Sequence, residues 1–336
     1  MEKDIKLVLR GTASFYEQTN RETTQSLENG NLVFLNMPLP VKCNYKCPKC
    51  FSGGSDIYQQ QLSKRGDFAE FDSDLRKRLI TEAKGLGAKT LVIGGAGEPL
   101  MFQGLEDILD VTDSNKMHTI IFTNGSLLSK QRAEDYFSRG VSLVFSFDSI
   151  SPEHYNIVTG TKGNYGEIRK NLEGALELSE KYSSEQNGFK VVPLAVNTNV
   201  TLLTYNPKEE IDEIKSIQNL IGDRATHFVS CITPTGNAVI NWKRLVGTAN
   251  FSPNPVLKEA EKIYSRGHGG SSRKKNGQCA YIHNGITAYE GYYMMCPNVG
   301  LEVDFGRYPN IPISEYFEAK KRLLQSKGNP LCATKR

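Results

Sequence analysis

Short apolar runs alternate with amphipathic segments from about residue 33 to residue 232, and this alternation restricts the fold more than any other feature. Apolar residues recur at helical spacing between the runs, as at Leu75, Leu79 and Ala83. Such an order is typical of a parallel sheet covered by helices. The expected strands cover residues 32–37, 90–93, 118–122, 142–147, 191–200 and 226–232, and the expected helices cover 75–86, 104–115, 129–138, 164–183 and 207–219.

Six strand–helix units predict an α/β protein with an open, partial TIM barrel, (βα)6, because the closed barrel has eight. Loops after the strands of such folds converge at one end, where ligands bind. The pattern changes after residue 235, and we expect a small C-terminal α+β domain with a helix, a flexible basic run and a β-hairpin. The expected parts are an N-terminal extension (1–32), the barrel (33–240) and the C-terminal domain (241–336), with its helix at 254–265, basic run at 267–277 and hairpin at 286–289 and 292–295.

Composition and charge exclude several classes of function. The formal net charge is only +4 over 336 residues and basic residues are interspersed with acidic ones, which argues against a dedicated nucleic-acid-binding protein. The N-terminus lacks the apolar segment of an export signal, and no stretch reaches the roughly 20 apolar residues of a membrane helix. We therefore expect a cytoplasmic protein, in which clustered cysteines indicate metal binding rather than disulfides.

Three cysteines are clustered directly after the first expected strand. Cys43, Cys47 and Cys50 form a C-x3-C-x2-C loop. Three thiolates can bind three irons of a 4Fe–4S cluster and leave the fourth iron open for a reactant. The alternative is a zinc knuckle, but zinc prefers C-x2-C pairs and no fourth Cys or His lies close in the sequence. The spacing favours the cluster.

The cysteine loop resembles the motif of the radical S-adenosylmethionine (SAM) superfamily. The resemblance implies that the open iron chelates SAM, that an electron from the cluster cleaves SAM, and that the resulting 5′-deoxyadenosyl radical abstracts hydrogen from a substrate. The family often has an aromatic residue just before the third cysteine, whereas this chain has Lys49, with aromatics at Tyr45 and Phe51 instead. This difference concerns the packing of adenine and not cluster ligation.

Polar turns after the later strands resemble SAM-binding segments of the same family. Residues 94–99 resemble its GGEP motif, 123–125 its TNG turn and 146–149 its SxD segment, which reaches the ribose and carboxylate of SAM. The resemblance implies that Gly97 contacts the SAM amine through its carbonyl, while Glu98 and Pro99 shape the turn. The implied SAM-binding residues are Gly95, Gly97, Glu98, Pro99, Asn124, Ser146, Asp148, Asn197 and Asn199.

The two asparagines of this set are also indicated by their spacing. Asn197 and Asn199 lie two apart on an expected strand, so both face one side, and polar groups on a buried strand need partners that SAM or a substrate would supply. Relatives often pair the SAM carboxylate with an Arg after the fourth strand. Here Thr159 lies near that place, and Lys162 is the candidate substitute.

Three further cysteines lie near the C-terminus. Cys279 and Cys296, with Gly291 between them, resemble the opening of the SPASM extension, and Cys332 follows where such folds return a ligand. The full SPASM cysteine run is absent, so we expect the shorter Twitch type with one auxiliary 4Fe–4S cluster. Three cysteines leave that cluster one ligand short. The fourth ligand could be Cys231 or His283, or the substrate, or the site could stay open. The alternative is that these are unreactive buried cysteines.

Cys231 ends the sixth expected strand, where side chains of a barrel point toward substrate. A thiol there could return a hydrogen atom to a carbon radical, as in radical SAM epimerases, and the alternative is a core cysteine.

The substrate is the least constrained part of the prediction. About 30 residues before the first strand are few for a leader-peptide-binding domain, which favours a natural-product precursor such as a sugar, aminocyclitol or nucleoside, undergoing dehydrogenation or epimerisation. The alternatives are a maturase of ribosomal peptides and a zinc-binding module without catalysis. The expected cofactors are the SAM-binding 4Fe–4S cluster, an auxiliary 4Fe–4S cluster and SAM, and the expected electron donor is a flavodoxin or ferredoxin.

Overall fold

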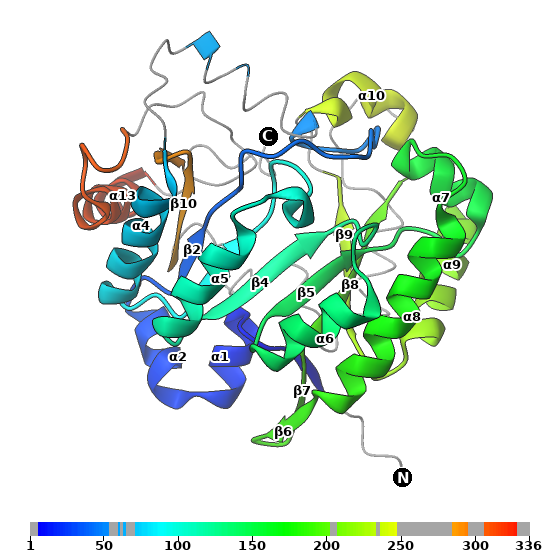
Figure 1. The fold of residues 1–336 in the computed structure, drawn as a ribbon, viewed down its shortest axis with the longest axis horizontal. Coiled ribbons are helices and arrows are strands. Elements are labelled where there is room, and N and C mark those ends of the chain that lie inside the picture. Colours follow the sequence, from blue (N-terminus) through cyan, green and yellow to red (C-terminus); the bar gives the residue numbers. More distant parts are fainter. Residues whose placement is uncertain are drawn as a thin grey trace.

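The computed structural model describes residues 6–53, 60, 63–64, 71–201, 207–232, 236–246, 284–294 and 306–327. Its centre is one eight-stranded sheet in the order β11-β10-β2-β3-β4-β5-β8-β9 (Figure 1). All neighbouring strands are parallel except the β10–β11 hairpin. The strands are β2 (Phe34–Asn36), β3 (Thr90–Ile93), β4 (His118–Thr123), β5 (Ser142–Ser146), β8 (Leu194–Val200), β9 (Thr226–Cys231), β10 (Gly285–Tyr289) and β11 (Tyr292–Met294).

The predicted α/β class and open parallel sheet are confirmed. Within the described chain the sheet ends at β9 on one side and β11 on the other, so no closed barrel forms. Helices cover its outer face (Figure 1), and several begin at a side-chain cap; Asp72, for example, accepts the N–H of Leu75. These elements are α4 (Ser73–Gly85), the 3-10 helix η2 (Pro99–Met101), α5 (Leu105–Ser114), α6 (Lys130–Ser138), α7 (Pro152–Thr159), α8 (Tyr165–Lys181), α9 (Pro207–Ile221) and α10 (Asn237–Val246).

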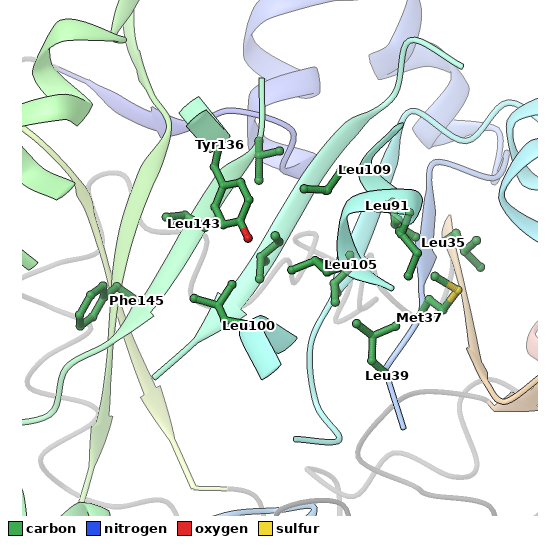
Figure 2. Close-up of a cluster of buried hydrophobic side chains, with 14 of the residues drawn as sticks. Leu35, Met37, Leu39, Leu91, Leu100, Leu105, Leu109, Tyr136, Leu143 and Phe145 are labelled. Atoms are coloured by element: carbon green, nitrogen blue, oxygen red, sulfur yellow. The ribbon is translucent and has the colours of Figure 1, made fainter. Parts of the chain in front are cut away.

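The main core lies between the sheet and these helices. Figure 2 shows strand residues Leu91 and Leu143 packed with Leu105 and Leu109 of α5 and Tyr136 of α6. All five side chains are at most 1% exposed. Burial of this apolar surface stabilises the fold and holds the strand ends, and thus the loops that follow them, in place.

The predicted strand over 191–200 is two strands. Pro193 has no N–H to donate, and the chain changes sheets there. The first piece, β7 (Phe189–Val192), pairs with β1 (Leu7–Leu9) and β6 (Ser184–Gln186) in a three-stranded sheet, and the second piece is β8. Four further elements were not predicted from the sequence: β1, β6 and the two N-terminal helices, α1 (Ala13–Thr19) and α2 (Arg21–Glu28). In Figure 1 these helices lie at the end of the sheet opposite α10.

The C-terminal hairpin forms as predicted, with a turn at Glu290 and Gly291 that both have positive φ. Its first strand, β10, pairs in parallel with β2, so the hairpin extends the same sheet. The helix α13 (Ile313–Lys327) packs beside it, and the ring of Tyr316 stacks on that of Tyr293 at 4.3 Å. The helix expected at 254–265 and the basic run at 267–277 lie outside the described residues. The domain boundaries stay a prediction.

Candidate functional site: the cysteine loop and the strand ends around it

The three predicted cluster ligands lie on one loop after β2. Cys43, Cys47 and Cys50 are half-buried free thiols, and the N–H of Cys50 donates to the carbonyl of Cys47 at 3.1 Å. The pKa of the Cys43 thiol is raised to about 11 and that of Cys47 to about 12, chiefly by burial and in smaller part by negative charge on the neighbouring Cys50. A thiolate in this loop therefore needs a cation beside it, which bound iron would supply.

Three glycines press the backbone of other segments against the cysteine loop. They come from the turn after β3, from the end of α7 and from the start of α10. At each one an added Cβ atom would overlap a carbonyl oxygen of the loop, so only glycine fits. The distances from that Cβ are 1.8 Å at Gly97 to Val41, 2.5 Å at Gly160 to Lys46 and 2.2 Å at Gly236 to Phe51.

The N-terminal half of α10 is hydrogen-bonded to the cysteine loop. The N–H of Asn237 donates to the carbonyl of Cys50 at 2.8 Å, and its side-chain amide donates to the carbonyl of Cys47 at 3.3 Å. Asn241, one turn on, donates to the carbonyl of Pro48 at 3.3 Å. These bonds satisfy the carbonyls between the second and third cysteines and fix the course of the loop. This helix was not predicted from the sequence.

Glu98 joins the glycine turn to the turn after β4. Its side chain is 2% exposed and its carboxylate accepts the hydroxyl of Thr123 at 2.7 Å, the N–H of Asn124 at 2.8 Å and the N–H of Leu100 at 3.1 Å. Burial raises the pKa of Glu98, while these three hydrogen bonds act in the opposite direction. The predicted Glu98 and Asn124 are therefore brought together, and Glu98 shapes both turns.

Asn124 in turn reaches the cysteine loop. Its side-chain amide donates to the Sγ of Cys43 at 3.7 Å and to the Oδ1 of Asn44 at 2.8 Å. On the other side of the loop, Ser52 contacts the Sγ of Cys50 at 3.4 Å and donates to the carbonyl of Ala96 at 3.0 Å. The turns after β3 and β4 thus touch the first and third cysteines, as expected for a site at the carboxyl ends of parallel strands.

Asp148, at the end of β5, is 7% exposed and forms an ion pair with Lys49 of the cysteine loop. Its Oδ1 also accepts the backbone N–H of Asn199 at 2.9 Å. Asn199 and Asn197 do face one side of β8, because the hydroxyl of Ser230 on β9 contacts the side-chain oxygens of both, at 3.4 and 3.1 Å. Asp148, Asn197 and Asn199 therefore form one connected group with Ser230.

Two acidic residues of α9 were missed by the sequence analysis. Glu210 is 5% exposed and accepts the N–H of Thr201 at 3.0 Å, and Glu213 accepts the hydroxyl of Ser149 at 2.7 Å. The pKa of Glu210 is raised to about 8, chiefly by burial and in smaller part by the charges of Asp148 and Glu213. In the sequence both look like ordinary acidic residues near the start of a helix, where negative charge interacts favourably with the helix dipole.

Several other predicted residues do not converge on the loop. The hydroxyl of Thr159 donates to the carbonyl of Tyr155 at 2.7 Å, inside its own helix, and Lys162 is exposed. Ser146 ends β5 in register with Asn197. Cys231 pairs with Val200 through the backbone, but its side chain lies outside the described part of the structure, as do Cys279, His283, Cys296 and Cys332.

Within the residues that the structure describes, no three Cys, His, Asp or Glu side chains are gathered as ligands of a single metal ion. The donor set of the cysteine loop suits iron–sulfur chemistry instead, because it offers three free sulfurs on one loop with hydrogen-bond donors beside two of them. None of the described helices combines the length and the apolar character that crossing a membrane requires.

Curated proteins with similar sequences include the Fe-coproporphyrin III synthase of Methanosarcina barkeri, which is 22% identical over 233 residues. This match covers 67% of this chain and 51% of that protein. The tungsten-containing aldehyde ferredoxin oxidoreductase cofactor-modifying protein of Pyrococcus furiosus is 27% identical over 238 residues, 70% of this chain and 61% of that protein. The chain therefore spans about half to three fifths of the length of these relatives.

Solved structures show the same fold. SuiB of Streptococcus suis bound to the precursor peptide SuiA has a TM-score of 0.61 at 15% identity, over 91% of this chain and 70% of that one. Native anSMEcpe with bound AdoMet has a TM-score of 0.56 at 14% identity, over 86% and 82% of the two chains. The model of the radical SAM superfamily matches residues 37–214, which include the cysteine loop and the turns after β3, β4 and β5. The chain belongs to the radical SAM superfamily.

Proposed function

We propose that Cys43, Cys47 and Cys50 hold a 4Fe–4S cluster whose fourth iron binds SAM, and that the chain uses it to abstract hydrogen from a C–H bond of an organic substrate. The observation that carries this proposal is a loop with three half-buried thiols, of which Cys43 contacts the turn after β4 and Cys50 is linked through Ser52 to the turn after β3. The cluster with bound SAM supplies a 5′-deoxyadenosyl radical. The chain's residues hold the iron, orient SAM and exclude water from the site.

The strand ends supply the groups that orient SAM. We propose that the carbonyl of Gly97 accepts the SAM amine, because the tight packing of this glycine on Val41 fixes where its peptide points. The polar groups at the ends of β5 and β8 would bind the ribose and the carboxylate by hydrogen bonds. The proposed contacts are Gly95, Gly97, Asn124, Ser146, Asp148, Asn197 and Asn199, with Glu98 and Pro99 shaping the turn.

Anaerobic reconstitution tests the cofactors. About four irons per chain fit one cluster, and about eight fit a second, auxiliary cluster at Cys279, Cys296 and Cys332. We keep the auxiliary Twitch-type cluster as a proposal, supported by the spacing of these cysteines. A Cys279→Ala, Cys296→Ala double variant should then lose about half of the iron. A colourless, zinc-loaded protein would instead support the non-catalytic zinc module.

For the substrate we propose a natural-product precursor of the sugar, aminocyclitol or nucleoside class. A peptide is the second candidate, because SuiB, which was solved with a precursor peptide, shares the fold over 91% of this chain. Turnover assays in deuterated water separate the two classes. One assay supplies a panel of small molecules and the other a panel of synthetic peptides, and the panel that yields product identifies the substrate class. One solvent deuterium in the product indicates epimerisation, whereas loss of two hydrogens without deuterium gain indicates dehydrogenation.

We further propose Cys231 as the hydrogen-atom donor of an epimerisation, since it ends β9 at the carboxyl side of the sheet. Cys231→Ala should abolish deuterium incorporation while SAM cleavage continues. Product formation by Cys231→Ala at the wild-type rate would contradict the role of Cys231 as hydrogen-atom donor. The proposed electron donor is a flavodoxin or ferredoxin, and the proposed compartment is the cytoplasm.

A further inference from the structure

The residue between the second and third cysteines carries a buried charge. Lys49 forms an ion pair with the Oδ2 of Asp148, and the two side chains are 9% and 2% exposed. Within the described residues the ammonium makes no hydrogen bond besides this pair. Removing two charges from water costs several kcal/mol per ion before their attraction offsets it. An apolar side chain would fill the same space without this cost, as the aromatic residue does that relatives often have at this position.

The positive end of the ion pair belongs to the cysteine loop. Lys49 lies between Cys47 and Cys50 in the chain, whereas Asp148 follows β5. Opposite charges attract, so the ammonium favours negative charge on the cluster that these cysteines would hold. On the other side, Asp148 is anchored to β8, because its Oδ1 accepts the N–H of Asn199 at 2.9 Å. The strand thus holds the carboxylate, and the carboxylate holds the ammonium of the loop in place.

This inference rests on the cluster proposed at Cys43, Cys47 and Cys50. We propose that Lys49 is a charge-balancing residue of that cluster, positioned by Asp148, and that its ammonium makes one-electron reduction of the cluster easier. One electron passes from a low-potential carrier, such as reduced flavodoxin or dithionite, to the cluster. The carrier is oxidised by one electron, the cluster gains one negative charge, and no bond is broken.

The physical reason is the local excess of negative charge. Three thiolates would surround the proposed cluster. Two buried carboxylates lie close by: Glu98 is linked to Cys43 through Asn124, and Asp148 pairs with Lys49. An added electron is unfavourable in such surroundings unless a cation lies near, and a cation counts for more in a buried site than in water. Lys49 supplies that cation from within the loop itself.

The test is the midpoint potential of the reconstituted cluster without SAM, measured by dithionite titration followed by electron paramagnetic resonance. Lys49→Met should make reduction at least tenfold less favourable, which is about 59 mV for one electron. Asp148→Asn should shift the potential in the opposite direction, because it removes a negative charge while its amide oxygen can still accept from the ammonium. Lys49→Arg keeps the charge and should stay near wild type.

Lys46→Met is the matched control. It removes an exposed ammonium next to Cys47, where water screens the charge, and should leave the potential unchanged. Equal potentials for wild type, Lys49→Met and Lys46→Met would overturn the role of Lys49. If Lys49→Met fails to bind iron, Lys49→Gln replaces it, because its amide can still donate to Asp148, and a wild-type potential in Lys49→Gln overturns the proposal. A wild-type protein without a reducible cluster would instead contradict the proposed function.

Discussion

The carboxylate of Glu98 accepts the backbone N–H of Asn124 at 2.8 Å, and this bond connects the glycine turn after β3 to the turn after β4. Asn124 then extends to the Sγ of Cys43. Two of the turns that the sequence marked as SAM-binding are therefore one hydrogen-bonded unit with the cysteine loop. The buried acid acts as a structural bridge inside the site.

Replacement of this bridge should weaken both the fold and the site. Glu98→Gln turns one acceptor oxygen into a donor that faces the N–H of Asn124 or the hydroxyl of Thr123, and we expect a loss of about 1–3 kcal/mol in the free energy of unfolding. Urea denaturation measures it, with Glu180→Gln, an exposed position of α8, as the control. Equal midpoints for the two variants would contradict the bridging role.

Docking of α10 on the cysteine loop should be sensitive to one methyl group. Gly236 and Gly222 have similar positive φ angles of 62° and 57°. An added Cβ would lie 2.2 Å from the carbonyl oxygen of Phe51 at Gly236, whereas nothing lies within 4 Å of it at Gly222. Gly222→Ala should cost about 1 kcal/mol of stability from backbone strain alone. Gly236→Ala should cost more and should also lower the iron bound on reconstitution. Equal iron content in both variants would count against this contact.

Gly97 offers a second test of the same kind at the other end of the loop. Its added Cβ would lie 1.8 Å from the carbonyl of Val41, whereas Gly166 in α8 has nothing within 4 Å. We expect Gly97→Ala to abolish SAM binding and to reduce iron content, because the turn must move. Gly166→Ala should be neutral or raise stability by up to about 1 kcal/mol. Isothermal titration with SAM separates them, and normal binding by Gly97→Ala would contradict the packing.

The stability of the protein should depend on pH through Glu210. Its pKa is raised by burial from 4.5 to about 8. The folded chain therefore keeps a proton that the unfolded chain loses above about pH 4.5, so this group makes folding less favourable as pH rises from about 4.5 to 8. Glu210→Gln removes the titration. Urea unfolding between pH 5 and 8 should show a gain of the variant over wild type that grows with pH, and a constant difference would contradict it.

The parallel strands were predictable because each one is a continuous apolar run, and the loops that follow such strands must meet at one edge. The resemblance to radical SAM motifs at these strand ends pointed to Glu98, Asn124 and Asp148, and spacing alone placed Asn197 and Asn199 on one side of β8. The prediction joined β7 to β8 because both strands are apolar, although Pro193 between them was a visible signal.

The contacts between distant loops could not be predicted. The pairing of Lys49 with Asp148 depends on how two loop ends are placed by separate strands, and no local pattern encodes that distance. Glu210 has the position of an ordinary helix-starting acid, and nothing in the local sequence indicates that its buried carboxylate accepts the N–H of Thr201. The role of α10 was hidden for the same reason, because its asparagines bind carbonyls of a loop far away in the sequence.

The central claim is that the cysteine loop carries the cluster that cleaves SAM. The direct measurement is 5′-deoxyadenosine formed from SAM by the anaerobically reconstituted, dithionite-reduced protein, compared with its Cys47→Ala variant. We predict 5′-deoxyadenosine from the wild type and none from the variant. A wild-type protein that holds about four irons per chain yet forms none, or a variant that forms as much as the wild type, would contradict the claim.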